Sequence, residues 1–151
     1  MGQEQTFLHV DDDPAILRIV AHKLGQYGYD AVSVEDPRQA LKRLLESGAR
    51  IVILDIDMPH IDGLSLLRQL KEHDGGIQVI MLTGMVSMGT VMQAMRWGAE
   101  GCVFKPIDDF DPLLNMMDAA YQKIDRWWDA LYERSQRKQV DEPAMTAAVK
   151  G

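Results

Sequence analysis

The 151-residue sequence has one cysteine, Cys102, and four histidines. A single cysteine excludes a disulfide within the chain and fits a reducing compartment, so we expect a cytoplasmic protein. The histidines show no metal-ligand spacing to Cys102 or to one another, which argues against a zinc site.

The sequence also lacks a long apolar run and a dense cluster of positive charge. No apolar run approaches the roughly 18 residues of a membrane span, and the N-terminus lacks the basic-then-apolar pattern of a signal peptide. The net charge is −7. The most basic segment, Arg134 to Lys138, is typical of a solvated helix end. We therefore expect neither direct nucleic-acid binding nor membrane association.

What the sequence does contain is an alternation of short apolar segments and amphipathic ones, with 46% hydrophobic and 26% charged residues. The expected strands cover residues 6–10, 31–34, 51–54, 77–82 and 102–104. The helices that follow the first four strands are expected to end near Gly25 or Gly28, Gly48, Gly75 and Gly98. Asp-Pro pairs at 13–14, 36–37 and 111–112 predict helix caps. Five strand–helix units in succession predict an α/β fold, with a parallel sheet covered by helices on both faces.

The segment IVILDIDMPHIDG, residues 51–63, ends a fully apolar run on carboxylates. A run without polar alternation indicates a strand buried on both faces of a parallel sheet. The carboxyl ends of parallel strands share one edge, where α/β proteins bind ligands. Asp11 and Asp12 follow the first strand and Asp55 follows the third, so we expect three carboxylates at this edge. Like charges there cost free energy unless they are neutralised, and oxygen-only ligands favour Mg²⁺.

Thr83 follows the fourth strand and Lys105 the fifth, so both reach the same edge. Carboxylate-bound Mg²⁺ usually bridges to phosphoryl oxygens, and a lysine and a hydroxyl would stabilise the charge of a phosphoryl group in transfer. Asp55 is the best-placed nucleophile because it ends the middle strand, and its product would be an aspartyl phosphate. Each residue also has a simpler explanation as a cap, turn or exposed lysine, but their joint arrangement disfavours it.

These residues resemble the receiver domain of two-component response regulators, over about residues 5–124. Four motifs carry the resemblance, in the family's order and spacing: VDDDP at 10–14, LDIDMPHIDG at 54–63, LTG at 82–84 and FKP at 104–106. It implies a flavodoxin-like (βα)5 three-layer sandwich with a five-stranded parallel sheet in strand order 2-1-3-4-5. It also implies a Mg²⁺-dependent signalling switch that is phosphorylated by a sensor histidine kinase. Such a domain catalyses its own phosphorylation and dephosphorylation and is not a turnover enzyme.

The resemblance assigns roles to the acidic residues. Asp55 matches the phosphoacceptor, which also contacts the metal. Asp11 and Asp12 match the acidic pair that holds Mg²⁺, with Asp12 the more direct ligand. Asp57 matches the position whose backbone carbonyl contacts the metal.

The resemblance assigns the remaining roles to the last two strand ends. Thr83 matches the switch hydroxyl that moves to the phosphoryl group, and Lys105 matches the lysine that pairs with that group. The Lys105–Pro106 peptide bond is cis in the family. Cys102 departs from the pattern, because the family usually has there a Tyr or Phe that rotates inward. We interpret Cys102 as a small buried residue on an edge strand rather than a redox site.

Two alternatives compete with this interpretation. ILDIDMP also resembles the D-x-D motif of haloacid dehalogenase phosphatases, in which Asp55 would accept the phosphoryl group and Asp57 would act as general acid. That motif normally closes the first strand, whereas here two strands and an acidic cluster precede it. A degenerate receiver that only binds partners is disfavoured because all five site residues are present.

Phosphorylation is expected to change the surface of the fourth helix, fifth strand and fifth helix. The helical spacing of the methionines at 85, 88, 92 and 95 predicts that most of them face the core. Trp97 lies off this stripe, so we expect it to be exposed at the output surface.

The last helix carries a heptad pattern, formed by Leu114, Met117, Tyr121, Ile124, Trp128 and Leu131. We divide the chain into a receiver (1–124), an extension of the last helix (125–138) and a flexible tail (139–151). Trp127, Trp128 and Leu131 lie beyond the usual receiver core and predict an interface with a second copy or a partner helix, rather than a helix that folds back. Roughly 30 residues beyond a receiver cannot hold an output domain. The chain is therefore a stand-alone receiver, which we favour, or a piece of a longer regulator with an unidentified target.

Overall fold

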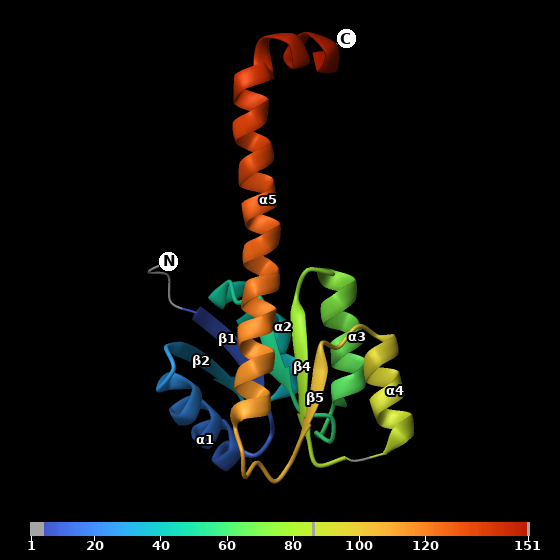
Figure 1. The fold of residues 1–151 in the computed structure, drawn as a ribbon. Helices are drawn as coiled ribbons and strands as arrows, with labels where there is room; N and C mark the ends of the chain where they lie inside the picture. Colours follow the sequence, from blue (N-terminus) through green and yellow to red (C-terminus); the bar gives the residue numbers. More distant parts are fainter. Residues whose placement is uncertain (1–4, 86, 151) are drawn as a thin grey trace. The chain divides into compact units, whose positions relative to one another are not determined.

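The computed structural model describes residues 5–85 and 87–150, with side chains up to Arg137. The elements in chain order are β1 (Gln5–Val10), α1 (Pro14–Gly25), β2 (Tyr29–Val34), the 3-10 helix η1 (Pro37–Gln39), α2 (Ala40–Ser47), β3 (Ile51–Leu54), α3 (Gly63–His73), β4 (Gln78–Thr83), α4 (Met88–Arg96), β5 (Gly101–Phe104) and α5 (Asp111–Lys150). All strand pairs are parallel and the order is β2-β1-β3-β4-β5 (Figure 1). The predicted α/β fold and strand order are confirmed.

Helix caps set where the first helices begin. Asp13 accepts a hydrogen bond from the Ala15 backbone N–H and starts α1. Asp36 caps in the same way, but the turn that it starts is the 3-10 helix η1, which runs into α2. The third predicted cap differs, because Asp111 is itself the first residue of α5 and donates its N–H to Asp109 Oδ1 at 2.9 Å.

The core lies on both faces of the sheet. Every residue of β3 and β4 is buried, as the unalternating apolar runs predict. One face packs against α2, α3 and α4, whose buried residues include Leu44, Leu66 and Ala94. The opposite face is covered by α1 and the first turns of α5 (Figure 1), where Val20 and Met117 are fully buried. Fully burying an aliphatic side chain stabilises a fold by roughly 1.5–3 kcal/mol.

Helix α4 contradicts the expectation for its methionines. Met88, Met92 and Met95 are 76%, 60% and 69% exposed, and Met85 is also exposed. The one buried residue of α4 is Ala94. A small side chain at this position lets the helix approach the core closely. The large methionines lie about 100–160° away from Ala94 around the helix, so they point outward. The prediction that most of them face the core is wrong.

The chain divides into two compact units, Met1–Met117 and Asp118–Gly151. The backbone of α5 is helical through Lys150, whereas the sequence predicts an aperiodic tail over residues 139–151. This stretch contains three alanines and one each of Gln, Glu and Lys, which favour helix. Its side chains lie outside the described residues, and the domain boundaries at 124 and 138 stay predictions. Among the described residues, no helix has the length and apolar character needed to cross a membrane.

Candidate functional site

The carboxyl ends of four strands meet at one edge of the sheet. The backbone N–H of Asp55, just beyond β3, donates to the Val10 carbonyl at the end of β1, with N and O 3.0 Å apart. The N–H of Lys105, just beyond β5, donates to the Thr83 carbonyl at the end of β4, at 2.9 Å. The hydrogen-bond ladders therefore bring the predicted site residues to one edge, as the sequence predicts.

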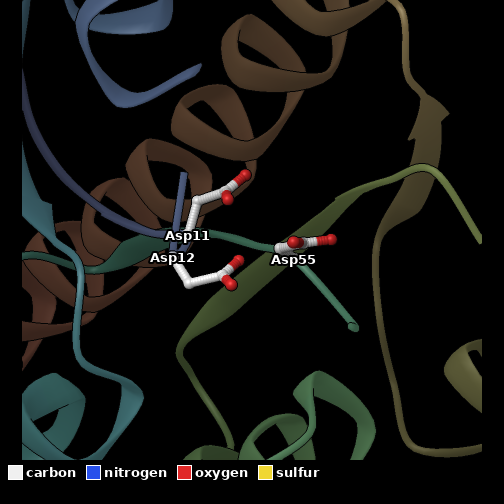
Figure 2. Close-up of side chains that lie close together, drawn as sticks. All are labelled: Asp11, Asp12 and Asp55. Carbon is white, nitrogen blue, oxygen red and sulfur yellow. The ribbon is translucent and has the colours of Figure 1, made fainter. Parts of the chain in front are cut away.

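Three carboxylates form a cluster at this edge. Asp11 and Asp55 are buried, whereas Asp12 is exposed, and one oxygen from each lies within 4.8 Å of the others (Figure 2). Carboxylate oxygens at this spacing are the hard ligands that a divalent cation prefers. An exposed member leaves the cation a route from solvent and room for bound waters. The donor set therefore fits a divalent metal ion.

Lys105 partly neutralises this negative charge. Its Nζ donates to Asp11 Oδ2 at 2.6 Å and lies 3.3 Å from Asp55 Oδ2. Burial alone would lower the pKa of Lys105, but the hydrogen bond to Asp11 and the charges of both carboxylates outweigh it and raise the pKa. Burial also raises the pKa of Asp11, against the opposing hydrogen bond from Lys105. One ammonium thus faces two buried carboxylates, which leaves the site short of positive charge.

The loop after Asp55 is held by a close backbone contact that the sequence did not reveal. Asp55 Oδ1 accepts the Ile56 N–H at 2.8 Å, and the Gly63 N–H donates to the Ile56 carbonyl at 2.8 Å. A Cβ atom at Gly63 would overlap the backbone carbonyl oxygen of Asp55. Glycine is therefore required at position 63 for steric reasons.

Thr83 is fully buried at the end of β4. Its Oγ1 accepts the backbone N–H of Met85 at 3.1 Å. The hydroxyl is thereby tied to the loop between β4 and α4, so a movement of this side chain would break a bond to that loop.

Asp57 does not join the carboxylate cluster through its side chain. Asp57 is exposed and lines a pocket of about 400 Å³, which α3, α4 and the loop containing Met85 also line. At another wall of this pocket the Arg68 guanidinium lies 4.3 Å from the ring centroid of Trp97, a cation–π contact. Trp97 is 36% exposed, which confirms the expected exposure, although the α4 methionines are more exposed.

Three further features lie near the ends of β1 and β5. Cys102 is half-buried on the edge strand β5, and burial raises the pKa of its thiol. The Lys105–Pro106 peptide bond is cis, as the resemblance implies. His9, which no motif in the sequence singles out, is fully buried in β1 two residues before Asp11. Neither ring nitrogen of His9 has a hydrogen-bond partner among the described residues.

The fold and this site define a receiver domain. The family model for the response regulator receiver domain matches residues 7–118, and the chain belongs to this family. Receiver domains of response regulators are signalling domains. The haloacid dehalogenase alternative is not supported, because the matched family is the receiver and two strands precede β3, the strand that Asp55 follows.

Individual relatives agree with this assignment. The chain is 36% identical over 121 residues to the C4-dicarboxylate transport transcriptional regulatory protein DctD of Pseudomonas aeruginosa, covering 80% of this chain and 26% of that protein. The chain thus spans about a quarter of this curated relative.

Solved structures are similar over most of the chain. A response regulator receiver domain protein from Clostridium thermocellum has a TM-score of 0.75 and 25% identity, covering 81% of this chain and 98% of the other. The response regulator TrrA of Thermotoga maritima, solved in complex with Mg²⁺ and BeF, has a TM-score of 0.70 and 28% identity, covering 77% and 98%.

Proposed function

We propose that Asp55 accepts a phosphoryl group and that the resulting aspartyl phosphate switches the domain between two states. The observation that carries this proposal is the cluster of Asp11, Asp12 and Asp55 carboxylates with Lys105 Nζ 3.3 Å from Asp55. The Asp55 carboxylate is buried and lies beside two further carboxylates that could hold a metal ion and beside the Lys105 ammonium. This arrangement suits it to attack a phosphorus atom.

The metal in this proposal is Mg²⁺, held by oxygens of Asp11, Asp12 and Asp55 and by the backbone carbonyl of Asp57. Mg²⁺ prefers one or two carboxylates plus waters and phosphoryl oxygens, which fits the exposed position of Asp12. When bound, the ion supplies charge stabilisation to the transferring group. TrrA, a structural relative, was solved with Mg²⁺ and BeF, which supports the choice of metal.

The phosphodonor is a phosphohistidine of a sensor histidine kinase. An Asp55 carboxylate oxygen attacks the phosphorus, the bond from phosphorus to the donor's imidazole nitrogen breaks, and the released imidazole takes a proton from solvent. Lys105 keeps its proton throughout, because the neighbouring carboxylates raise its pKa, and stabilises the charge on the phosphoryl oxygens. The catalytic groups belong to the receiver, so a small phosphodonor can replace the kinase.

The switch acts through Thr83. When its hydroxyl turns to donate to the phosphoryl group, Thr83 Oγ1 no longer accepts the hydrogen bond from the Met85 backbone N–H. The loop to α4 then repacks, which shifts the population between two arrangements of the α4–β5–α5 surface.

The downstream partner is a protein that reads this surface. DctD is by name a transcriptional regulator, which partly conflicts with the expectation of no direct nucleic-acid binding. We assign contacts with DNA to other polypeptide segments and only protein contacts to this receiver, because the chain carries a net charge of −7.

The test is incubation with acetyl phosphate and Mg²⁺ followed by intact-mass measurement. The chain is expected to gain one phosphoryl group that hydroxylamine removes, and to gain none when EDTA replaces Mg²⁺. Asp55→Asn keeps the shape of the side chain and removes the nucleophile, so it should remain unlabelled. Asp57→Asn is the matched control, because only the backbone carbonyl of residue 57 is assigned a role. Equal labelling of Asp55→Asn and wild type would disprove the assignment.

A further inference from the structure

The extension of α5 exposes a group of large apolar side chains. Trp127, Trp128, Leu131 and Tyr132 are 70%, 65%, 56% and 64% exposed, and all four lie beyond residue 118, where the family match ends. Contiguous exposed apolar surface of this kind usually marks an interface. The receiver site does not explain these residues, since none of them belongs to it.

Their positions in the heptad are selective. With Trp128 at position a, Leu131 falls at d, Trp127 at g and Tyr132 at e. These are the four positions that line the contact in a two-stranded coiled coil. The remaining positions, b, c and f, hold Gln122, Lys123, Arg126, Asp129, Ala130 and Glu133, all polar except one alanine. The apolar face therefore has the width of a helix pair, not of a helix covered on several sides.

We infer that this face pairs with the same helix of a second copy of the chain, in parallel and in register. In a parallel pair, position g of one helix lies beside position e of the next heptad on the other. Trp127 of each copy would then contact Tyr132 of the other, on both sides of the a and d layers. Aromatic pairs of this kind add to the stabilisation from burial alone. A second copy is thus an occupant that covers all four exposed residues at once.

The pairing is weak because the apolar face is short. The next a position is Ser135, which ends the apolar series. We therefore expect a monomer–dimer equilibrium with a dissociation constant on the order of 100 µM rather than a permanent dimer. The inference does not depend on phosphorylation, so Asp55→Asn is expected to self-associate like the wild type.

Sedimentation equilibrium of the full chain tests the pairing. Between low and high micromolar concentrations the average mass is expected to rise from 17.0 kDa towards twice that value. Leu131→Glu places a charge at d and should raise the dissociation constant at least about tenfold, because it removes a buried leucine and buries a carboxylate. Ala130→Glu adds the same charge at c and should change it less than about threefold.

Disulfide trapping tests the register. In a Cys102→Ser background, Leu131→Cys places two thiols opposite each other at d, and mild oxidation should give a covalent dimer, because d-layer Cα atoms lie close enough for a disulfide. Glu133→Cys lies at f, on the far side of the helix, and should stay mostly monomeric. A full chain that is monomeric at several hundred micromolar would overturn the inference and leave a different partner or a folded-back helix. Equal trapping at 131 and 133, or a dimer unaffected by Leu131→Glu, would overturn the parallel heptad.

Discussion

Replacement of the buried histidine in β1 should make the receiver more resistant to acid. Burial, and secondarily the positive charge of Lys105, lower the pKa of His9 from 6.5 to about 3. Between pH 6.5 and about 3, His9 therefore binds a proton in the unfolded chain but not in the folded chain. Stability then rises with pH wherever the unfolded state binds more protons, so this contribution is complete above pH 6.5 and is lost as the pH falls towards 3.

The size of the effect follows from the difference between the two pKa values. The difference of 6.5 − 3 = 3.5 units corresponds to about 5 kcal/mol at about 1.4 kcal/mol per unit, comparable to the whole stability of a small domain. At pH 5 the loss is about 2 kcal/mol, from 6.5 − 5 = 1.5 units. His9→Leu keeps a similar volume and has no proton to bind. It should also gain about 1–3 kcal/mol at pH 7, because it removes two buried nitrogens that have no hydrogen-bond partner among the described residues.

The assay is urea unfolding, followed by circular dichroism, at pH 7, 6 and 5. The difference in unfolding free energy between His9→Leu and wild type cancels the titration of the acidic residues that both share, and it should widen by about 2 kcal/mol from pH 7 to pH 5. His73→Gln is the matched control, since His73 is exposed, and the widening should be larger for His9→Leu than for this variant. A constant difference for His9→Leu, or a variant less stable at every pH, would refute the reasoning.

Two further predictions concern Gly63 and Thr83, which lie beside the carboxylate cluster. Gly63→Ala should reduce the rate of phosphorylation by acetyl phosphate at least about tenfold and destabilise the fold by roughly 1–3 kcal/mol, because its Cβ would displace the Asp55 carbonyl. Gly75→Ala, which would meet no described atom within 4 Å, should leave both measurements unchanged. Thr83→Ala should still be phosphorylated but should lose the phosphorylation-dependent shift of the Met85 amide in NMR spectra, whereas Thr83→Ser should keep it, because the serine hydroxyl can accept the same N–H.

The gathering of Asp11, Asp55 and Lys105 at one edge of the sheet could be predicted from the order of residues along the chain. Charged residues that directly follow apolar runs, as Asp55 follows β3 and Lys105 follows β5, can only lie at the carboxyl ends of strands. Parallel pairing then brings those ends together without any knowledge of side-chain conformations. The hydrogen bond of 2.6 Å from Lys105 to Asp11, between residues far apart in sequence, is the outcome of that rule.

The orientation of α4 could not be predicted in the same way. Hydrophobic periodicity assigns the buried face of a helix to its largest apolar side chains, which in α4 are a stripe of methionines. Packing instead favours burial of the face that allows the closest approach to the core, and a small residue such as Ala94 permits that approach. Where the two criteria point to different faces, the large side chains remain exposed, and the sequence alone does not indicate which criterion prevails.

The importance of Gly63 and His9 could not be predicted from the sequence for a related reason. Gly63 at the start of a helix and His9 in a strand each have an ordinary local explanation. Gly63 is distinguished by its close approach to the Asp55 backbone, and His9 by ring nitrogens that have no hydrogen-bond partner among the described residues. His9 lowers stability, because its buried ring nitrogens have no hydrogen-bond partner among the described residues, and it lies two residues before Asp11. Asp11 adds a second cost, since burial disfavours its charged form. Such costs around a cluster of acidic residues are expected of a preorganised site, because its groups must be held in place before the ligand binds.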